Sequence, residues 1–306
     1  MNEKRDLVII GGGVAGLTAS IYACRKGIDN VVLEAELPIG STGIAPLIEN
    51  YPGFPEGISG IELMQKIEKQ AKKFGADIRT FEPVKELKIE GHKKIVLTNK
   101  GDYEAKAIII AVGAKPVKIP EELGIQEDRF IGRGLSYCAT CDGPLFKGKR
   151  VVVIGNENEA FNEALYLSEL CSEVTLVAPK QINADKVLIE RFKERGKIVQ
   201  GEIKGIVGEE VVEGVIIKTG DEEKTLPVQG VFVALGRKAP AIEVFQKAGI
   251  DIKNRFIEVD RNMETSIKGI FAAGDVTGQP FQIAKAVGEA CVAAISAYKY
   301  IKTLHQ

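Results

Sequence analysis

Short apolar runs and helical patterns alternate along the chain, which is typical of parallel α/β folds. An apolar run at 7–10 ends in a glycine-rich stretch at 11–16 and is followed by a helical pattern at 17–26. After a turn at Gly27, a second apolar run covers 31–33. This order predicts a β-α-β unit in which the glycine-rich stretch joins the first strand to the helix.

The same order begins again in the middle of the chain. An apolar run at 151–154 ends at Gly155, a helical pattern extends to Leu170, and another apolar run covers 174–177. The two glycine loops begin 144 residues apart (155 − 11), which is too far for a solenoid repeat and suits two related nucleotide-binding folds. The length of 306 residues agrees with two domains.

Each unit continues in the same way. Alternating patterns predict a small antiparallel layer, followed by a continuous apolar strand at 107–112 in the first unit and at 230–235 in the second. A long helical pattern at 284–302 remains after the second unit is complete, and we expect it to pack on the first. The predicted fold is α/β, with two Rossmann-like domains of three layers (ββα). The first domain is discontinuous, covering 1–115 and 242–306, and the second covers 116–241.

Charge and hydropathy exclude several classes of protein. The chain has 41 basic and 42 acidic residues and a net charge of −1, which provides no electropositive field for nucleic acid. No apolar run approaches the roughly 18 residues of a membrane span, and no apolar signal region follows the polar start at 1–6. We expect a cytoplasmic protein whose partners include neither nucleic acid nor a membrane.

The first glycine loop has the spacing of a dinucleotide-binding motif. Gly11, Gly13 and Gly16 form G-x-G-x-x-G between a strand and a helix. The first glycine permits a tight turn, the second lets the backbone approach a pyrophosphate, and the third lets helix and strand pack closely. Glu34 follows 18 residues later (34 − 16), where a carboxylate accepts hydrogen bonds from ribose hydroxyls. An acidic residue there favours a ribose without a 2′-phosphate, and hence FAD or NAD.

Two of the five cysteines, Cys138 and Cys141, form a C-x-x-C pair. Such a pair can close a small-ring disulfide, with one thiolate exposed for exchange and the other resolving it. A zinc half-site is the alternative, but it would need further ligands, and the other cysteines are scattered singly. Because the chain has only two histidines, His92 and His305, we predict no metal site.

Asp142 follows the cysteine pair directly. Its carboxyl can hold or deliver the proton that joins or leaves a thiolate as the pair opens and closes, although a turn before the next glycine and proline would also account for it. The remaining cysteines, Cys24, Cys171 and Cys291, lie among apolar residues, which favours small buried side chains. One redox pair without a disulfide framework favours a reducing compartment.

These motifs together resemble the low-molecular-weight thioredoxin reductases, and the resemblance covers the whole chain. The segment E-N-Y-P-G-F at 49–54 is similar to the family's segment near the flavin, and S-Y-C-A-T-C-D at 136–142 is similar to its redox segment. Residues 274–275 resemble the second FAD motif, whose carboxylate contacts the ribityl chain. Residues 282–284 resemble those beside the isoalloxazine.

The resemblance implies a homodimer in which FAD passes electrons to the cysteine disulfide and the dithiol then reduces a thioredoxin-like protein. It implies that Cys138, Cys141 and Asp142 are catalytic. In this family the second domain rotates, so that the cysteines face the flavin and the protein partner in turn. The implied FAD contacts are Gly11, Gly12, Gly13, Ala15, Gly16, Glu34, Ala35, Gly40, Asn50, Gly113, Gly274, Asp275, Gln282, Ile283 and Ala284.

The second glycine loop departs from the family's pattern. Glu157 stands where the second glycine would let the backbone touch a pyrophosphate, and its charge would repel that group. The family's His-Arg-Arg type cluster, which grips the 2′-phosphate of NADPH, is replaced by A-P-K-Q at 178–181. Phe281 stands where the family usually has arginine, and Ser41 replaces a glutamine. We therefore hypothesise that NADP(H) is a poor donor and that reduced ferredoxin or a deazaflavin (F420) supplies the electrons.

Three alternatives stay open at the level of the sequence. NADPH or NADH can still bind through an altered loop. A dithiol oxidase, which passes electrons from substrate thiols to O₂, uses the same parts in reverse. A non-catalytic redox sensor would use FAD and the cysteines to switch a partner, although nothing in the sequence resembles a signalling appendage.

Overall fold

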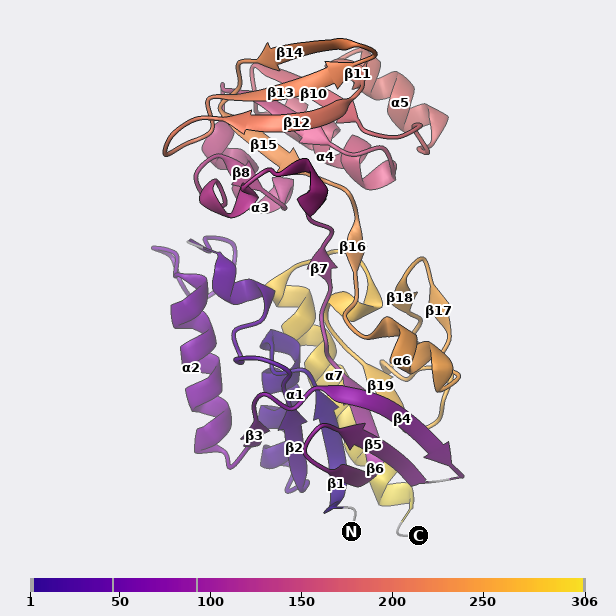
Figure 1. The fold of residues 1–306 in the computed structure, drawn as a ribbon. Helices are drawn as coiled ribbons and strands as arrows, with labels where there is room; N and C mark the ends of the chain where they lie inside the picture. Colours follow the sequence, from indigo (N-terminus) through magenta and orange to yellow (C-terminus); the bar gives the residue numbers. More distant parts are fainter. Residues whose placement is uncertain (1–2, 46, 92, 305–306) are drawn as a thin grey trace. The chain divides into compact units, whose positions relative to one another are not determined.

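The computed structural model describes residues 3–45, 47–91 and 93–304, and the chain forms two compact units (Figure 1). Unit 1 comprises Met1–Lys115 and Lys238–Gln306, and unit 2 comprises Pro116–Arg237. The chain returns to unit 1 after Arg237, four residues before the predicted boundary, because Ala239 and Ile242 are already buried in the core of unit 1. His92 and His305 lie outside the described residues.

A seven-stranded sheet forms the centre of unit 1, in the order β3-β2-β1-β6-β5-β4, and β19 pairs with β6. The strands β1, β2, β3, β6 and β19 are parallel, whereas β5 and β4 extend the sheet from β6 in antiparallel pairs. The bounds are β1 (Glu3–Ile10), β2 (Asn30–Leu33), β3 (Asp77–Arg79), β4 (Val84–Glu90), β5 (Lys93–Thr98), β6 (Asp102–Ile110) and β19 (Ile270–Ala272).

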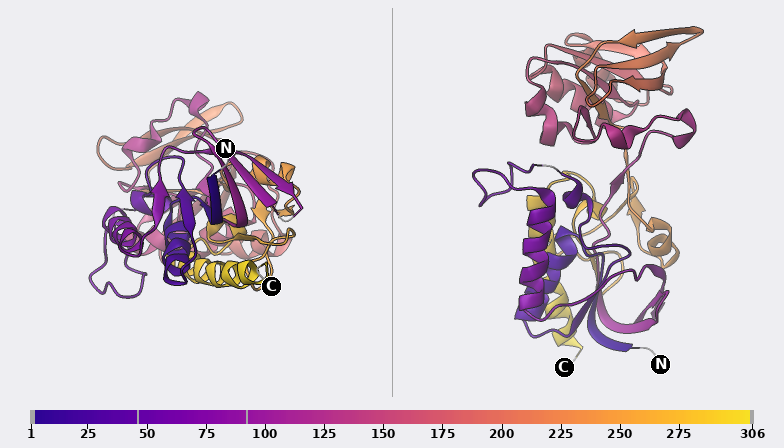
Figure 2. Two further views of the ribbon diagram at one scale, coloured as in Figure 1. Left: turned by 90° about the horizontal axis from the view of Figure 1, so that it is seen from below. Right: turned by 60° about the vertical axis from the view of Figure 1, so that its left-hand side comes forward.

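Three helices cover one face of this sheet: α1 (Val14–Arg25), α2 (Gly60–Lys73) and α7 (Ile283–Thr303) (Figure 2). Alternate residues of the central strands, such as Leu7 of β1 and Ile109 of β6, pack against these helices. The small residues on the buried side of α7 lie in the same core as the buried residues of α1. The last helix therefore completes unit 1, as its position in the sequence predicts.

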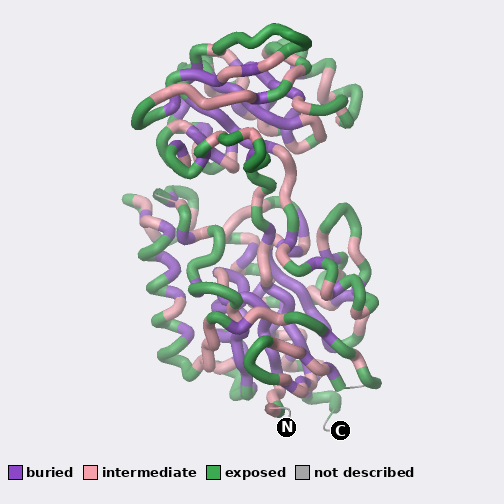
Figure 3. The backbone as a smooth tube through the Cα atoms, in the orientation of Figure 1, coloured by how far each residue is buried: buried purple, intermediate pink, exposed green. Residues whose placement is uncertain are grey.

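The opposite face of the same sheet carries a second apolar core. Val8 and Ile10 of β1 share it with Leu87 of β4, Val96 of β5 and Phe245 of α6. Figure 3 shows buried backbone through the middle of unit 1 and exposed backbone mainly in its outer turns. Because the sheet is covered on both faces here, the last four residues of β1 (7–10) and of β6 (107–110) are all apolar and buried. The remaining elements of unit 1 and of the two crossings are η1 (Ser41–Ile44), α6 (Ile242–Lys247), β7 (Lys115–Pro116), β16 (Arg237–Lys238), β17 (Ile252–Lys253), β18 (Phe256–Ile257) and η5 (Asp275–Thr277).

Unit 2 repeats this arrangement on a smaller scale. Its parallel sheet has the order β11-β10-β9-β15-β8, with helices α4 and α5 on one face and the antiparallel sheet β12-β13-β14 on the other. The prediction of an α/β fold with two Rossmann-like domains is confirmed. The bounds are η2 (Glu121–Leu123), η3 (Glu127–Arg129), β8 (Leu135–Ser136), α3 (Ala139–Asp142), η4 (Gly143–Phe146), β9 (Arg150–Ile154), α4 (Asn158–Ser168), β10 (Glu173–Ala178), α5 (Lys186–Lys193), β11 (Lys197–Gln200), β12 (Glu202–Val207), β13 (Gly214–Thr219), β14 (Glu222–Leu226) and β15 (Gly230–Val233).

None of the helices in the described part of the chain has the length and apolar character needed to cross a membrane.

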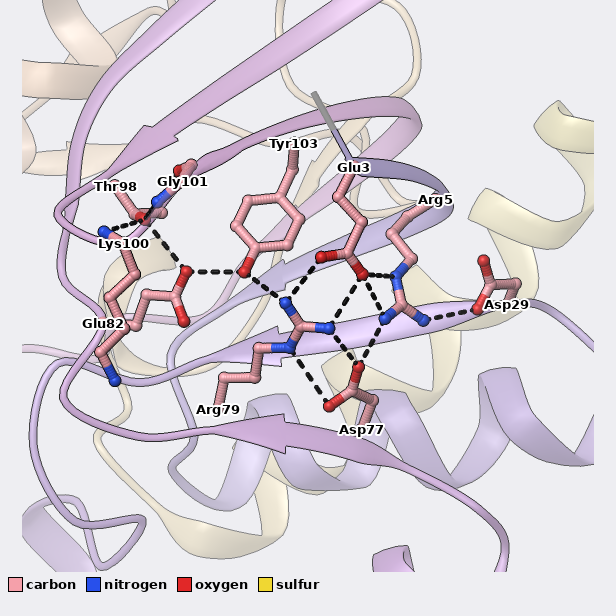
Figure 4. Close-up of polar contacts among 10 residues, drawn as sticks. All are labelled: Glu3, Arg5, Asp29, Asp77, Arg79, Glu82, Thr98, Lys100, Gly101 and Tyr103. Atoms are coloured by element: carbon pink, nitrogen blue, oxygen red, sulfur yellow. Dashed lines mark hydrogen bonds and ion pairs between the residues drawn. The ribbon is translucent and has the colours of Figure 1, made fainter. Parts of the chain in front are cut away.

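A charged network in unit 1 joins the start of β1, the end of β3 and the start of β6 (Figure 4). The guanidinium of Arg79 donates to Glu3 at 2.7 Å, to Asp77 at 2.9 Å and to the Tyr103 hydroxyl at 2.8 Å. That hydroxyl donates in turn to the buried carboxylate of Glu82 at 2.6 Å. Burial and the bond to Glu82 raise the pKa of Tyr103 to about 12, and the hydrogen bonds to Glu3 and Asp77 raise the pKa of Arg79.

Replacing the central cation of this network should destabilise unit 1. We expect Arg79→Met to lower the free energy of unfolding by about 1–3 kcal/mol, because Glu3, Asp77 and the Tyr103 hydroxyl lose their donor in a partly buried site. Urea denaturation followed by circular dichroism measures the change. Arg195→Met is the control, since it removes an exposed pair with Glu169 and should cost about 0.5 kcal/mol or less. Equal effects of the two substitutions would contradict the role of the network.

Candidate active site

The predicted redox cysteines lie in unit 2, with Cys138 directly before α3 and Cys141 within it. Cys138 and Cys141 form a disulfide, with their Cα atoms 5.3 Å apart. The Sγ atom of Cys138 accepts a hydrogen bond from the backbone N–H of Cys141 at 3.2 Å and lies 3.4 Å from the Thr140 hydroxyl. Cys141 is exposed and Cys138 is half-buried. A thiolate on Cys138 would therefore have two hydrogen-bond donors beside it.

Asp142, the predicted acid, is connected to the cysteine pair through Ser136. The Ser136 hydroxyl donates to Asp142 Oδ2 at 2.6 Å, and its oxygen accepts the backbone N–H of Cys138 at 3.0 Å. Burial raises the pKa of Asp142 above that of an exposed aspartate, and the bond from Ser136 only partly opposes this shift. The carboxyl therefore keeps a proton to a higher pH than usual, which suits a proton donor beside a disulfide.

Tyr137, which precedes the pair, is held by two hydrogen-bond partners that the sequence did not reveal. Its hydroxyl donates to the buried carboxylate of Glu127, and its backbone carbonyl accepts a hydrogen bond from Arg237 at 3.1 Å. Burial and the bond to Glu127 raise the pKa of Tyr137, so the phenol stays neutral. These partners lie 10 and 100 residues away in sequence, and together they fix the strand that presents Cys138.

The other three cysteines are half-buried, not fully buried as predicted. The sulfur of Cys24 accepts a hydrogen bond from the Asn30 side chain at 3.1 Å, and the Cys171 thiol donates to the Phe146 carbonyl at 3.3 Å. Polar partners near helix ends keep these two sulfurs close to the surface. Among the described residues, no group of three or more His, Cys, Asp or Glu side chains is arranged to hold a metal ion.

The glycine loop of unit 1 connects β1 to α1, and its glycines lie in tight surroundings. A side chain at Gly11 would collide with the Ala111 carbonyl, and one at Gly16 would collide with the Gly11 carbonyl. Beside Gly13, in contrast, the space is open to at least 4 Å. The loop therefore leaves its middle glycine accessible, which is the position where a pyrophosphate approaches the backbone.

Glu34 lies next to this loop at the end of β2. Its carboxylate accepts hydrogen bonds from the backbone N–H of Gly12 at 2.6 Å and from that of Glu36 at 2.9 Å. A carboxylate has about four acceptor positions, so two remain for hydroxyl groups. The predicted contact Ala35 follows directly in sequence, at the same carboxyl end of the parallel strands.

Several of the other predicted flavin contacts lie close to one another or to the glycine loop. A Cβ added to Gly40 would lie 3.3 Å from the Cα atom of Gly13, and a Cβ added to Gly274 would lie 2.9 Å from the Cβ atom of Ala15. The Asn50 amide donates to the Gln282 side chain at 3.1 Å. The structure places the others near these pairs along the chain: Gly113 after β6, Asp275 at the start of η5, and Ile283 and Ala284 at the start of α7.

Two charged residues that the sequence did not single out hold the second flavin motif. The ammonium of Lys285 donates to the carbonyls of Gly274 at 2.9 Å and Gly278 at 2.7 Å, and it pairs with Glu289 at 3.2 Å. Glu289 also accepts the backbone N–H of Gly274 at 2.9 Å. An i,i+4 spacing of lysine and glutamate was the available signal, but it is common on exposed helices. An open glycine loop, a ribose-type carboxylate and a fixed second motif fit FAD.

The glycine loop of unit 2 is hydrogen-bonded to a segment that follows it in the chain. We define the closing segment as residues 181–185, which follow β10. Its Asn183 donates from the backbone to the Asn156 carbonyl at 2.8 Å, and its Gln181 carbonyl accepts the Asn156 side chain at 3.2 Å. Asp185 and Asn158 exchange two hydrogen bonds, at 2.7 and 3.0 Å. The residues after Gly155 and the closing segment are therefore bonded to each other.

Comparisons with known proteins agree with this geometry. The profile of the "Pyridine nucleotide-disulphide oxidoreductase" family matches residues 5–290. A "34.2 kDa protein in rubredoxin operon" of Clostridium pasteurianum is 41% identical over 98% of this chain and 99% of its own length. The thioredoxin reductase of Bacillus subtilis is 36% identical over 100% of this chain and 98% of its own.

Solved structures give the same result. The thioredoxin reductase of Streptococcus pyogenes is 34% identical with a TM-score of 0.88, covering 99% of this chain and 100% of the other. A ferredoxin-flavin thioredoxin reductase from Clostridium acetobutylicum is 36% identical with a TM-score of 0.54, covering 100% and 99%. From the family match, the full-length relatives and the disulfide site, this chain belongs to the pyridine nucleotide-disulphide oxidoreductase family and is a flavin-dependent disulfide oxidoreductase of the thioredoxin reductase type.

Proposed function

We propose that this protein reduces the disulfide of a thioredoxin-like protein through its Cys138–Cys141 pair. The observation that carries the proposal is the disulfide at the start of α3, with an exposed Cys141 and with Asp142 connected to Cys138 through Ser136. The exchange needs one thiolate that attacks the partner's disulfide and a second thiol that resolves the mixed disulfide. Both sulfurs belong to one turn, so the second is always within reach of the first.

FAD would be held in unit 1 by the open backbone at Gly13, the carboxylate of Glu34 and the segment that begins at Gly274. When bound, it supplies the two electrons that convert the disulfide into a dithiol. Lys285 and Glu289 keep the Gly274 segment in place by bonding to its backbone.

Asp142 would handle the proton of the thiol–disulfide exchange. Two electrons break the S–S bond and leave negative charge on the sulfurs, which one proton converts into a thiol and a thiolate. Burial favours the protonated carboxyl at Asp142, and Ser136 fixes its orientation. The carboxyl can therefore donate to the leaving sulfur on reduction and accept the proton back when the pair closes.

We propose further that reduced ferredoxin or a deazaflavin, and not NADPH, supplies the electrons. Glu157 is the N-cap residue of α4 and makes no side-chain capping hydrogen bond, and the closing segment bonds to the adjacent loop residues. Opening the loop for a pyrophosphate would break these hydrogen bonds and bring a carboxylate close to the anion. The Clostridium acetobutylicum neighbour is a ferredoxin-flavin thioredoxin reductase, which supports a donor of this kind. The homodimer and the cytoplasmic location stay predictions.

The donor can be identified from the colour of the flavin. We expect that under anaerobic conditions reduced ferredoxin or reduced F420 bleaches the oxidised flavin rapidly, whereas micromolar NADPH or NADH does so slowly, because the loop is closed. Stopped-flow absorbance with each donor in turn measures the rates. Fast bleaching by micromolar NADPH would contradict the proposed donor and would support an altered pyridine nucleotide site. Rapid peroxide formation from a dithiol and O₂ would favour the dithiol oxidase.

Replacing either cysteine should abolish turnover and leave the flavin site intact. We expect Cys138→Ser and Cys141→Ser to remove all measurable reduction of a thioredoxin-like disulfide, since neither attack nor resolution can be completed. The flavin absorbance and the FAD content of the purified protein should be unchanged. Cys171→Ser is the matched control, because this half-buried thiol of the same unit lies outside the pair. Turnover that survives in both active-site variants would exclude the proposed reductase.

Removing the transferable proton should slow the exchange. We expect Asp142→Asn to lower kcat by about 10²-fold with little change in KM, because the amide can still bond to Ser136 but cannot donate an acid proton. Asp128→Asn, at an exposed ion pair with Lys118 in the same unit, is the control and should leave kcat unchanged. Steady-state kinetics across pH with the preferred donor tests this. A kcat equal to that of the wild type would exclude Asp142 as the acid.

A further inference from the structure

A second carboxyl with a buried oxygen, that of Glu163, lies beside residues 138–142, which we call the redox turn, and has no part in the mechanism described so far. Helix α4 packs against α3, and the buried side chains Ala160 and Ala164 of α4 share one core with Ala139 of α3. Glu163 lies three residues after Ala160 and next to Ala164, on the side of α4 that faces this core. The glutamate at 163 therefore occupies a position on the side of α4 that the buried alanines at 160 and 164 mark as the interior side.

The carboxyl of Glu163 is poorly satisfied in this position. Its Oε2 atom is buried and has no hydrogen-bond partner among the described residues. The backbone N–H of Ala139, the residue next to Cys138, acts on the carboxyl as a hydrogen-bond donor. A buried polar atom without a partner is unfavourable for folding, so stability does not explain why an acid stands here. The position suggests a role connected to α3.

The surroundings of Glu163 are mostly apolar. β9 and β10 contribute Val153 and Leu176, and α5 contributes Phe192, to the core on which α4 packs. The charges that act on Glu163 are those of Glu159, one turn earlier, and Arg237 of β16, while α3 adds the cysteine pair and Asp142. Burial raises the pKa of Glu163 to about 8, and the charge of Glu159 contributes to this rise. The hydrogen bond from the Ala139 amide and the charge of Arg237 act in the opposite direction. This value belongs to the disulfide state of the pair.

We propose that Glu163 is a positioning residue for the Cys138–Cys141 couple: its carboxyl, set against the first residue of α3, takes up a proton when the pair is reduced and releases it when the disulfide forms again. The residue acts through the field at α3 and is not itself a proton donor to sulfur. The proposal rests on the proposed function, which supplies the electrons that reduce the cysteine pair.

The proton balance follows from the charges. Reduction adds two electrons, breaks the S–S bond and, with one proton on sulfur, leaves a thiol and a thiolate. The new negative charge disfavours an ionised Glu163, so a carboxylate that was ionised in the disulfide state takes a second proton from solvent. When the dithiol reduces a partner's disulfide, two electrons leave and both protons are released. Below the pKa of the disulfide state Glu163 is already protonated, and no additional uptake occurs.

The equilibrium between the pair and dithiothreitol tests this without any turnover. Full-length, FAD-loaded protein is equilibrated anaerobically with dithiothreitol mixtures between about pH 6.5 and 9.5, and the oxidised fraction of the Cys138–Cys141 peptide is measured by alkylation and mass spectrometry. We expect the wild type and Glu163→Gln to agree near pH 6.5. Near pH 9, Glu163→Gln should be reduced about fivefold more readily, because no carboxylate opposes the thiolate.

Matched variants separate this effect from a structural one. Glu169→Gln makes the same change at the exposed end of α4 and should follow the wild type at every pH. Glu163→Asp keeps an ionisable group and should restore the dependence on pH. A constant ratio between Glu163→Gln and the wild type across pH, or the same change in Glu169→Gln, would overturn the proposal.

A second measurement covers the case in which Glu163→Gln does not fold. In the Asp142→Asn protein, with Glu163 in place, reduction near pH 9 should increase the infrared absorption of protonated carboxyl groups. An unchanged carboxyl band would overturn the proposal. Because these are equilibrium measurements, their failure beside normal thioredoxin reduction would exclude only the role of Glu163, whereas inactive wild type would exclude the proposed function.

Discussion

The register of β1 between β2 and β6 fixes the position of the glycine loop in unit 1. Ile10 aligns with Leu33 on one side and with Ile110 on the other, so all three strands end at one level. The backbone continues the pairing beyond the strands, since the Gly11 N–H donates to the Leu33 carbonyl at 2.8 Å. The loop therefore turns directly against Ala111, where only glycine fits. Small shifts of this register would move the whole loop away from Glu34.

Unit 2 has the same frame, but its loop has a different use. Gly155 donates to the Val177 carbonyl at 3.0 Å, and Ala234 donates to the Ile154 carbonyl at 2.8 Å, which repeats the geometry of unit 1. The side chains after Gly155 differ: asparagines at 156 and 158 bond to the closing segment. The same strand-to-loop hydrogen bonds thus support a loop that is open beside Gly13 in unit 1 and a loop that is bonded to the closing segment in unit 2. What each loop can bind therefore depends on its side chains, which a comparison of the folds does not take into account.

Several polar groups near the redox turn of unit 2 are partly or fully buried, and they differ in how well their hydrogen bonds are satisfied. Tyr137 and Glu127 satisfy each other, and Asp142 is held by Ser136. Glu163 has an oxygen for which the described part of the chain offers no hydrogen-bond partner. Burial raises the pKa of Asp142 and of Glu163, so a disulfide that gains negative charge has two carboxyls nearby whose protonated forms are favoured. A polar environment of this kind is costly to build and is typical of sites where charge changes during function.

The sequence by itself determined the fold class and the location of the chemistry. Periodic apolar runs predicted both β-α-β units, because the period of burial follows from backbone geometry alone. The spacing of Gly11, Gly13 and Gly16 and the C-x-x-C pair predicted the loop and the disulfide, since their parts lie within a few residues of one another.

Only the tertiary structure decided which side chains meet. The return to unit 1 after Arg237, the closing segment, the bonds of Lys285 to the second flavin motif and the place of Glu163 under α3 all depend on it. Their partners lie apart in sequence or on different elements, and lysine, glutamate and asparagine are common on exposed helices and loops. No local pattern separates a solvated glutamate from a buried one, because burial of a polar group depends on the neighbours that packing brings to it.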